Sequence, residues 1–363
     1  MSTLEYYPSR EDMDMIKGRR LSLLIVILAL LVPATSYGQS RIGTTSATFL
    51  TLGTGARGSA LGHAYTAVVN GPDALFWNPG AAAVPYMDQY RGGAFFTHHD
   101  WFADISYNAA GVIVPVTRAG VIGLSLANVD YGRMDVRTVA EPNGTGETFT
   151  ASDITFGLSY AQALTNSFYF GGTFRYVRQG IRDMSASTGA VDFGFVLITR
   201  YLNGMRIAAS MMNFGGKMKM DGVNAERPID VDPSSEGSNE SIPSRIRMDS
   251  WDLPLLFKFG VAVPVIKMNN VELQLLADAN QTNDNNLNGD LGALLRYQTN
   301  SVTFDGRVGY KDAFLEQDLV DSHWSFGAGV EVRVTQVRFG FDYAFVPFDY
   351  LSNTNMVDFR VYF

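Results

Sequence analysis

Residues 324–345 read WSFGAGVEVRVTQVRFGFDYAF, and apolar and polar residues alternate one by one through most of this stretch. Alternating side chains point to opposite faces of a β-strand, so the stretch predicts two strands, the second beginning near Thr335. One face carries bulky aromatic residues, and the other carries charges such as Glu331 and Arg333. A soluble sandwich can show the same alternation, but this division is typical of a barrel with one face in lipid and a wet lumen.

The same alternation recurs along most of the chain after Met87. It predicts fourteen strands, beginning near Gln89, Phe102, Ala119, Thr150, Ser167, Ser187, Gly204, Asp252, Asn270, Gly289, Ser301, Ser322, Thr335 and Thr354. Connections after the even strands are short, as at 164–166, whereas those after the odd strands are mostly longer, as at 131–149. Short turns on one side and long loops on the other, with an even strand number, predict an outer-membrane barrel with both termini periplasmic. The predicted fold is therefore an all-β, antiparallel, fourteen-stranded outer-membrane barrel.

The composition fits this fold. The chain has 363 residues, with 36 Gly, 24 Phe and 17 Tyr, and only 18% of its residues are charged. Glycine and aromatic residues suit strands and tight turns, and barrels of this length are often one domain. The sequence contains no Cys, which excludes disulfides and thiolate metal sites. A net charge of −8 argues against nucleic acid as a partner.

The N-terminal region predicts export. Lys17, Arg19 and Arg20 precede an apolar run at 21–32, and small residues follow around Ser36 to Gly38. This arrangement is typical of a secretory signal peptide, here 1–38, and the run is too short for a membrane-spanning helix. The polar residues ahead of it make Met13 or Met15 an alternative start.

Between the signal and the strands, residues 52–81 read LGTGARGSALGHAYTAVVNGPDALFWNPGA. Glycine and alanine allow close packing and sharp turns, so we interpret 39–88 as a hatch inside a barrel formed by 89–363. Gly53, Gly55 and Gly58 match the dinucleotide fingerprint GxGxxG. That motif needs a βαβ unit, and the strand pattern predicts none.

Other motifs give no clear site. Asp284, Asn286, Asn288 and Asp290 resemble the start of an EF-hand loop, but Leu295 stands where a closing Glu belongs, which favours a polar external loop. The four His residues lack HExxH spacing, and we expect His98-His99 in an external loop. No nucleophile stands out beside a base, although a dispersed triad remains open. We therefore expect no enzyme activity, no cofactor and no metal.

The sequence also allows predictions for a long loop and for the C-terminus. The loop at 215–251 contains DVDPSSEGSNESIPS at 230–244, which is poor in apolar residues and should be flexible. It could gate the barrel, contact a partner or serve as a solvated tether. At the C-terminus, apolar residues alternate again, and this pattern resembles the signal read by barrel-assembly machinery or is an ordinary last strand; these residues are Phe359, Val361 and Phe363.

The residues 49–64 and 73–79 together resemble a known family. They read FLTLGTGARGSALGHA and DALFWNP, and FDYAFVPF follows at 341–348. These segments are similar to signatures of the PorV/PorQ family, which is related to FadL-type transporters. The resemblance implies a fourteen-stranded outer-membrane barrel with an N-terminal hatch bearing an Asn-Pro-Ala element. The chain departs from that pattern at Gly80, at Gly71-Pro72 and at His63.

The resemblance implies two classes of function. PorV-like proteins serve the type IX secretion system, where they bind the C-terminal signal domain of cargo and carry it from the translocon to the attachment complex. FadL-like relatives pass hydrophobic molecules through a hatch-gated barrel and out sideways into the bilayer. We expect the secretion role, with outer-membrane lipid and secretion proteins as partners. Transport of a hydrophobic ligand is the alternative, and a purely structural barrel is a third.

Within the hatch, glycines would permit close packing, charged residues would pair with lumen charges, and Asn78-Pro79 would form a turn. The candidate hatch residues are Gly53, Gly55, Arg57, Gly58, Gly62, Asp73, Asn78 and Pro79. The expected lumen partners are Asp305, Arg307, Glu331 and Arg333. The alternative is that all of these residues are only structural.

Overall fold

The computed structural model describes residues 43–85, 92–101, 103–117, 119–230, 234, 241–313, 323–348 and 352–363. The predicted signal peptide at 1–38 lies outside these ranges and remains a prediction. Within them, no helix is both long enough and apolar enough to cross a membrane.

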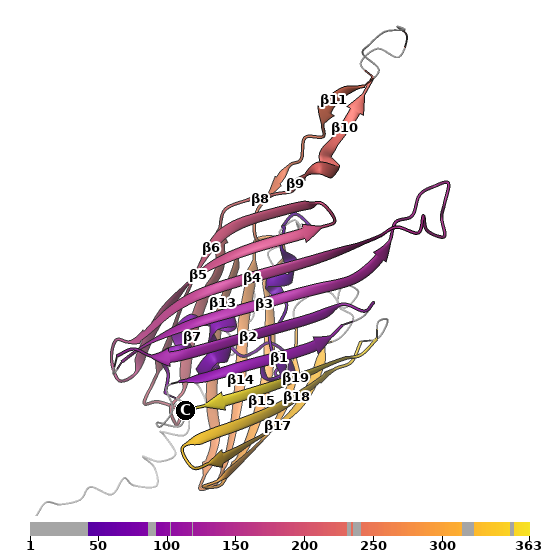
Figure 1. Ribbon diagram of the computed structural model, residues 1–363. Helices are drawn as coiled ribbons and strands as arrows, with labels where there is room; N and C mark the ends of the chain where they lie inside the picture. The colour runs from indigo at the N-terminus through magenta and orange to yellow at the C-terminus, as the bar shows by residue number, and fades with distance from the viewer. Residues whose placement is uncertain are drawn as a thin grey trace, which may run out of the picture. The chain divides into compact units, whose positions relative to one another are not determined.

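Fourteen strands form one closed antiparallel barrel, as predicted (Figure 1). Neighbours in the chain pair with each other, β7 pairs with β13, and β1 closes the barrel against β19. The strands are β1 (Gly93–Asp100), β2 (Ser106–Pro115), β3 (Gly120–Asp135), β4 (Thr148–Ala163), β5 (Phe168–Ile181), β6 (Met184–Ile198), β7 (Arg206–Gly215), β13 (Leu256–Met268), β14 (Val271–Thr282), β15 (Asn288–Gln298), β16 (Val302–Tyr310), β17 (Trp324–Val334), β18 (Val337–Val346) and β19 (Thr354–Tyr362).

The alternation in the sequence sorts side chains between the two faces of the wall. On β4, Phe156 and Leu158 are exposed, whereas Thr155 and Ser159 are buried inside. Apolar side chains therefore cover the outside, and polar ones line the lumen, as in barrels whose outer face contacts lipid.

Two details differ from the sequence predictions. The connection between β5 and β6 has only two residues, although long loops were expected mostly after odd strands. His98 and His99 were placed in an external loop, but both lie in β1, which continues to Asp100. Pairing of β1 with both β2 and β19 extends to this residue, and it holds the two histidines in the sheet.

The hatch, described at residues 43–85, lies inside the barrel. It contains only short helices, namely η1 (Thr48–Thr51), α2 (Ala56–Ala60), η2 (Gly71–Asp73), α3 (Ala74–Trp77) and η3 (Pro79–Ala83). Its apolar residues form three buried clusters with inward residues of the wall, and one of them joins Leu61, Val69 and Leu75 to Ile113 and Val196. The barrel thus encloses a packed core rather than an open pore.

The segment between β7 and β13 forms an arm, defined here as residues 216–255. Strand β8 (Met218–Lys219) pairs with β12 (Ser250–Trp251), and β9 (Asp221–Gly222) pairs with β6. After η4 (Val223–Ala225), β10 (Glu226–Ile229) and β11 (Ile242–Arg245) form a hairpin that makes a separate sheet, labelled beyond the ends of β6 and β7 in Figure 1. Most of the stretch predicted to be flexible, 230–244, lies outside the described residues.

Candidate functional site

Arg57 connects the hatch to one side of the barrel wall. It lies on α2, its side chain is 5% exposed, and it forms ion pairs with Glu331 of β17 and Asp342 of β18. Its Nε donates to Asp342 Oδ2 at 3.1 Å. Burial alone would lower the pKa of this guanidinium, but its acidic neighbours Asp342, Tyr362, Glu331 and Tyr65 together outweigh burial and raise the pKa well above its ordinary value. Arg57 is therefore a permanent buried cation.

Asp73, at the other charged position of the hatch, pairs with Arg360 of β19. Arg360 donates from Nε to Asp73 Oδ1 at 2.7 Å and from Nη2 to Asp73 Oδ2 at 2.6 Å. The same guanidinium contacts Asp342 and, at 2.6 Å, Asp358. Tyr65 of the hatch also donates to Asp73, at 3.2 Å; burial and this carboxylate raise the pKa of its phenol.

The predicted lumen partners fall into three groups. Glu331 pairs with Arg57. Asp305 and Arg307 pair with each other at 2.7 Å, and Arg307 also pairs with Asp342 at 2.6 Å, within the same network. Arg333, in contrast, is exposed near the end of β17 and donates to the carbonyl of Thr335. The expectation of Arg333 as a buried partner is therefore wrong, because its strand has reached the end of the barrel.

Asn78 and Pro79 contact the opposite side of the wall. The buried Asn78 amide donates to the carbonyls of Thr66 and Phe195 at 3.2 and 3.0 Å, and its oxygen accepts from Gly80 N. Pro79 begins η3, which lies against β4, β5 and β6. A Cβ on Gly171 of β5 would lie 2.7 Å from the Pro79 oxygen, so this glycine allows hatch and wall to meet.

The four candidate glycines permit close contacts, each for a different reason. Gly55 has a φ of 90°, and a Cβ there would meet Phe95 and Asp358. Gly62 has a φ of 60° and lies against the backbone of Tyr310. The other two pack under rings: Gly53 under His63 and Gly58 under Trp77. The five-residue α2 and antiparallel strand pairs do not form the βαβ unit that a nucleotide loop needs.

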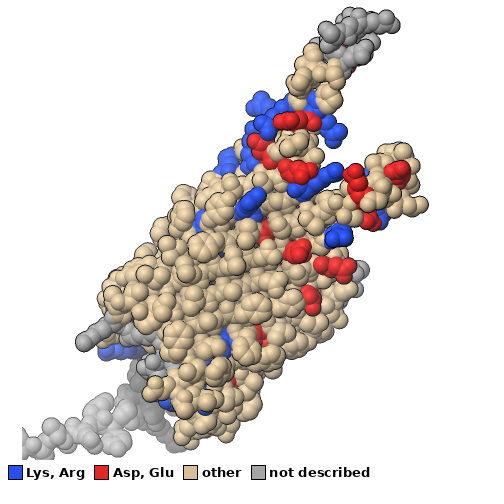
Figure 2. Space-filling view, in the orientation of Figure 1, with Lys and Arg blue, Asp and Glu red and all other residues tan. Residues whose placement is uncertain are grey.

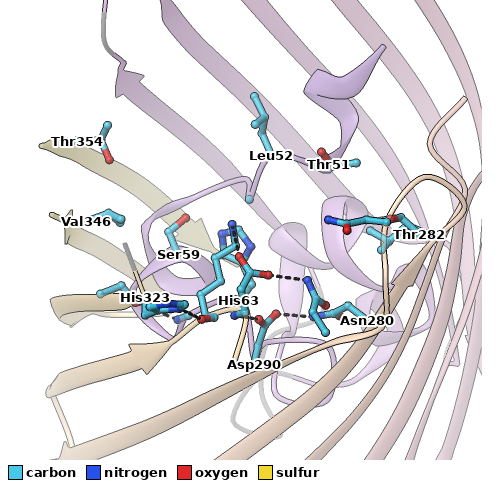
Figure 3. Close-up of a pocket in the computed structure, with 18 of the residues that line it drawn as sticks. Thr51, Leu52, Ser59, His63, Asn280, Thr282, Asp290, His323, Val346 and Thr354 are labelled. Atoms are coloured by element: carbon cyan, nitrogen blue, oxygen red, sulfur yellow. Dashed lines mark hydrogen bonds and ion pairs between the residues drawn. The ribbon is translucent and has the colours of Figure 1, made fainter. Parts of the chain in front are cut away.

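A cavity of about 460 Å³, here called the vestibule, lies between the hatch and the wall (Figure 3). Its hatch residues include Leu52, Ser59 and His63, and its wall residues come from the ends of β1, β13, β14, β15, β17, β18 and β19 and from the adjoining loops. In Figure 3, His63, Asn280, Asp290 and His323 gather on one side of it, and Leu52 and Thr354 lie across from them. The hatch thus forms one side of this cavity. The cavity lies at the end of the barrel where the loops that follow the odd-numbered strands are found.

Sequence reasoning missed several residues of this region. Arg360 and Asp342 complete the buried ion network, Asp278 accepts from Tyr65 N and Thr66 N at 3.2 and 2.9 Å, and Lys258 lies 4.7 Å over the Trp77 ring. All four lie at polar positions of strands in which polar and apolar residues alternate, and this pattern indicates that their side chains face inward. Their partners in the hatch are about 180 to 290 residues away in the sequence, and the strand pattern does not predict such pairs.

The remaining candidates are placed as follows. Phe359 and Phe363 are 52% and 51% exposed on the outer side, with Val361 between them, and their role in assembly remains a prediction. In the EF-hand-like segment, Asp284 accepts from Thr45 of the hatch at 2.8 Å. Among the described residues, no group of three or more His, Cys, Asp or Glu side chains could hold a metal.

No protein-family model matches the sequence, and no curated protein is detectably similar to it. Solved structures with a similar fold do exist. They include the Pseudomonas putida toluene transporter TodX, which is 10% identical with a TM-score of 0.53 over 84% of this chain and 96% of that one. The CymD monoaromatic hydrocarbon channel has a TM-score of 0.54 at 10% identity, over 85% of this chain and 97% of CymD. A Pseudomonas aeruginosa FadL homologue has a TM-score of 0.53 at 10% identity, over 85% and 98%. The chain therefore shares the fold of FadL-like outer-membrane barrels.

Proposed function

We propose that this protein is a hatch-gated outer-membrane transporter of small, largely hydrophobic molecules and that it catalyses no reaction. The observation that carries the proposal is the vestibule, because the hatch itself forms part of its lining. A ligand held there contacts the segment that blocks the lumen, so binding can favour a displaced hatch if the ligand binds that state more tightly. The fold shared with TodX, CymD and the FadL homologue supports this proposal over a secretion role.

The proposal also covers the location of the protein and its orientation in the membrane. The signal peptide delivers the chain to the outer membrane, both termini are periplasmic, and the vestibule faces outward. The hatch glycines, Arg57, Asp73, Asn78 and Pro79 hold the gate closed, and the outward aromatics of β19 serve membrane assembly. Outer-membrane lipid and the transported molecule are the partners.

A disulfide lock tests the gate. Ala60 of α2 and Ala344 of β18 pack in one buried cluster, and the native chain has no Cys, so Ala60→Cys with Ala344→Cys supplies two thiols that can only pair with each other within the chain. We expect the oxidised protein in proteoliposomes to lose uptake of a panel of compounds with an eight-carbon alkyl chain, namely octane, octanoate, octylamine and octyl glucoside. The reduced form of the same variant is the control. Equal uptake of the panel by the two forms would contradict gating by the hatch.

A secretion role of the PorV type is the second candidate, and the arm is the observation that favours it. Among the described residues, β10 and β11 pair only with each other, and apolar residues on the arm are exposed, including Val223, Ile229 and Ile246. Such a surface could bind the C-terminal signal domain of cargo next to the translocon or the attachment complex. Deleting the gene would then leave signal-domain proteins uncleaved in the periplasm. Normal secretion in that strain would exclude this candidate.

A further inference from the structure

One side of the vestibule holds two carboxylates whose oxygens already have donors. Asp290 accepts from Asn280 Nδ2 at 2.5 Å and from the Asp312 backbone N at 3.0 Å. Asp312 accepts from Asn288 Nδ2 at 2.5 Å and pairs with Lys311 at 3.3 Å. The negative charge on this side of the vestibule is therefore satisfied by residues of the wall.

The two amide donors leave their own oxygens without partners. An ionised carboxylate only accepts hydrogen bonds, so against an ionised aspartate each amide directs its nitrogen at the carboxylate, and this fixes where each Oδ1 points. The Oδ1 atoms of Asn280 and Asn288 are buried and have no hydrogen-bond partner in the part of the chain that the structure describes. The wall thus offers two unmatched acceptors, and Asn280 as a whole is only 6% exposed.

His323 supplies a third acceptor. Its Nδ1 lies 2.9 Å from the carbonyl of Lys311, and because a carbonyl only accepts, Nδ1 must carry the proton. In the neutral ring the other nitrogen, Nε2, is then an acceptor, and it is buried without a partner among the described residues. Burying an acceptor without a donor is unfavourable, so three of them on one side of the vestibule favour a ligand that donates.

From these acceptors we infer the substrate class: an amphiphile with a neutral head group that bears several hydroxyls, such as an alkyl glycoside. The inference rests on the proposed transport function: Asn280, Asn288 and His323 line the vestibule, but their acceptor atoms are buried in this structure, so the head group reaches those atoms when the hatch shifts. The hydroxyls donate to Asn280, Asn288 and His323. The apolar lining receives the tail; it includes Leu52, Leu256, Val346, Phe348 and Met356.

Other head groups fit less well. A carboxylate has no proton to donate, so it leaves the three acceptors unmatched even where Lys258 or Lys311 attracts it. A plain hydrocarbon leaves all three acceptors unmatched. An ammonium could donate, but it would share the vestibule with Lys311 and with Lys258, which is only 8% exposed and contributes a cation of its own.

The test compares the uptake of the same four octyl compounds by the full mature protein in proteoliposomes. We expect octyl glucoside to be taken up at least about tenfold faster than octane or octanoate, since tenfold corresponds to about 1.4 kcal/mol, near the value of one hydrogen bond. His323→Phe keeps a ring beside Tyr310 and should reduce octyl glucoside uptake about tenfold. Asn288→Leu should do the same, and His98→Phe, a change at a histidine outside the vestibule lining, should not.

The outcomes separate this inference from the transport proposal. In one outcome the disulfide lock abolishes uptake, but octane, octanoate or octylamine is taken up as fast as octyl glucoside or faster. That result would leave the transport proposal intact and overturn the inferred head group. Unchanged octyl glucoside uptake in a folded His323→Phe and a folded Asn288→Leu protein would also overturn it. Uptake that is insensitive to the lock for every compound would remove the transport proposal itself.

Discussion

The two sides of the hatch are held to the wall by different interactions. On the α2 side, Arg57 and Asp73 enter a network of buried ion pairs with β16–β19. On the η3 side, Asn78 and Pro79 pack closely against glycines of β5 and β6. Separating a buried ion pair into water restores the hydration of both charges, so the net cost is smaller than the number of pairs suggests. Separating the close-packed side loses contacts that water does not replace. The α2 side is therefore the one that should open.

The largest effect is expected from removing one partner of the network. Arg360→Ala leaves Asp73 and Asp358 buried without their cation, which should cost about 3–5 kcal/mol of stability. The measurement is the free energy of unfolding in detergent from denaturant titration. Arg333→Ala, which removes an exposed arginine near the end of the wall, should change it by less than about 0.5 kcal/mol. Equal effects of the two substitutions would show that the network does not hold the hatch.

A smaller effect is expected on the close-packed side. Gly171→Ala places a methyl group 2.7 Å from the Pro79 oxygen and 2.8 Å from Ala161 Cβ, and this overpacking should cost about 1–3 kcal/mol. Gly306→Ala on β16 is the matched control, because its Cβ would meet nothing within 4 Å. Comparable unfolding free energies for both variants would mean that the η3 side is loose, contrary to the comparison above.

The smallest effect is expected when both charges of one pair are replaced. Arg57→Met alone leaves Glu331 buried without its closest cation and should cost about 3 kcal/mol. Arg57→Met with Glu331→Leu removes both charges, and the loss should shrink to about 1 kcal/mol or less. A double-mutant cycle on unfolding measures this difference. A double variant less stable than Arg57→Met alone would contradict this expectation and would show that Glu331 stabilises the protein through another partner, such as Arg338.

The sequence was informative wherever local pattern decides structure. The alternation in residues such as 324–345 is enough to predict strands, their number and their outer face, because each side chain has only two directions. Pairs across the lumen were harder: Asp73 and Arg360 are separated by 287 positions, and nothing local connects them. The sequence pattern also did not predict the tight turn at Arg182-Asp183 or the separate hairpin of the arm. Where a strand ends and a loop begins depends on tertiary contacts, which the local pattern does not show.

The position of Arg360 bears on how the molecule is assembled. It lies on β19, which closes the barrel by pairing with β1, and the same residue holds Asp73 of the hatch. The same strand, β19, therefore both closes the barrel and holds the hatch. The structure thus couples two events that are distant in the sequence: Asp73 has this counter-ion only when the hatch lies inside the barrel and β19 is in its place beside β1.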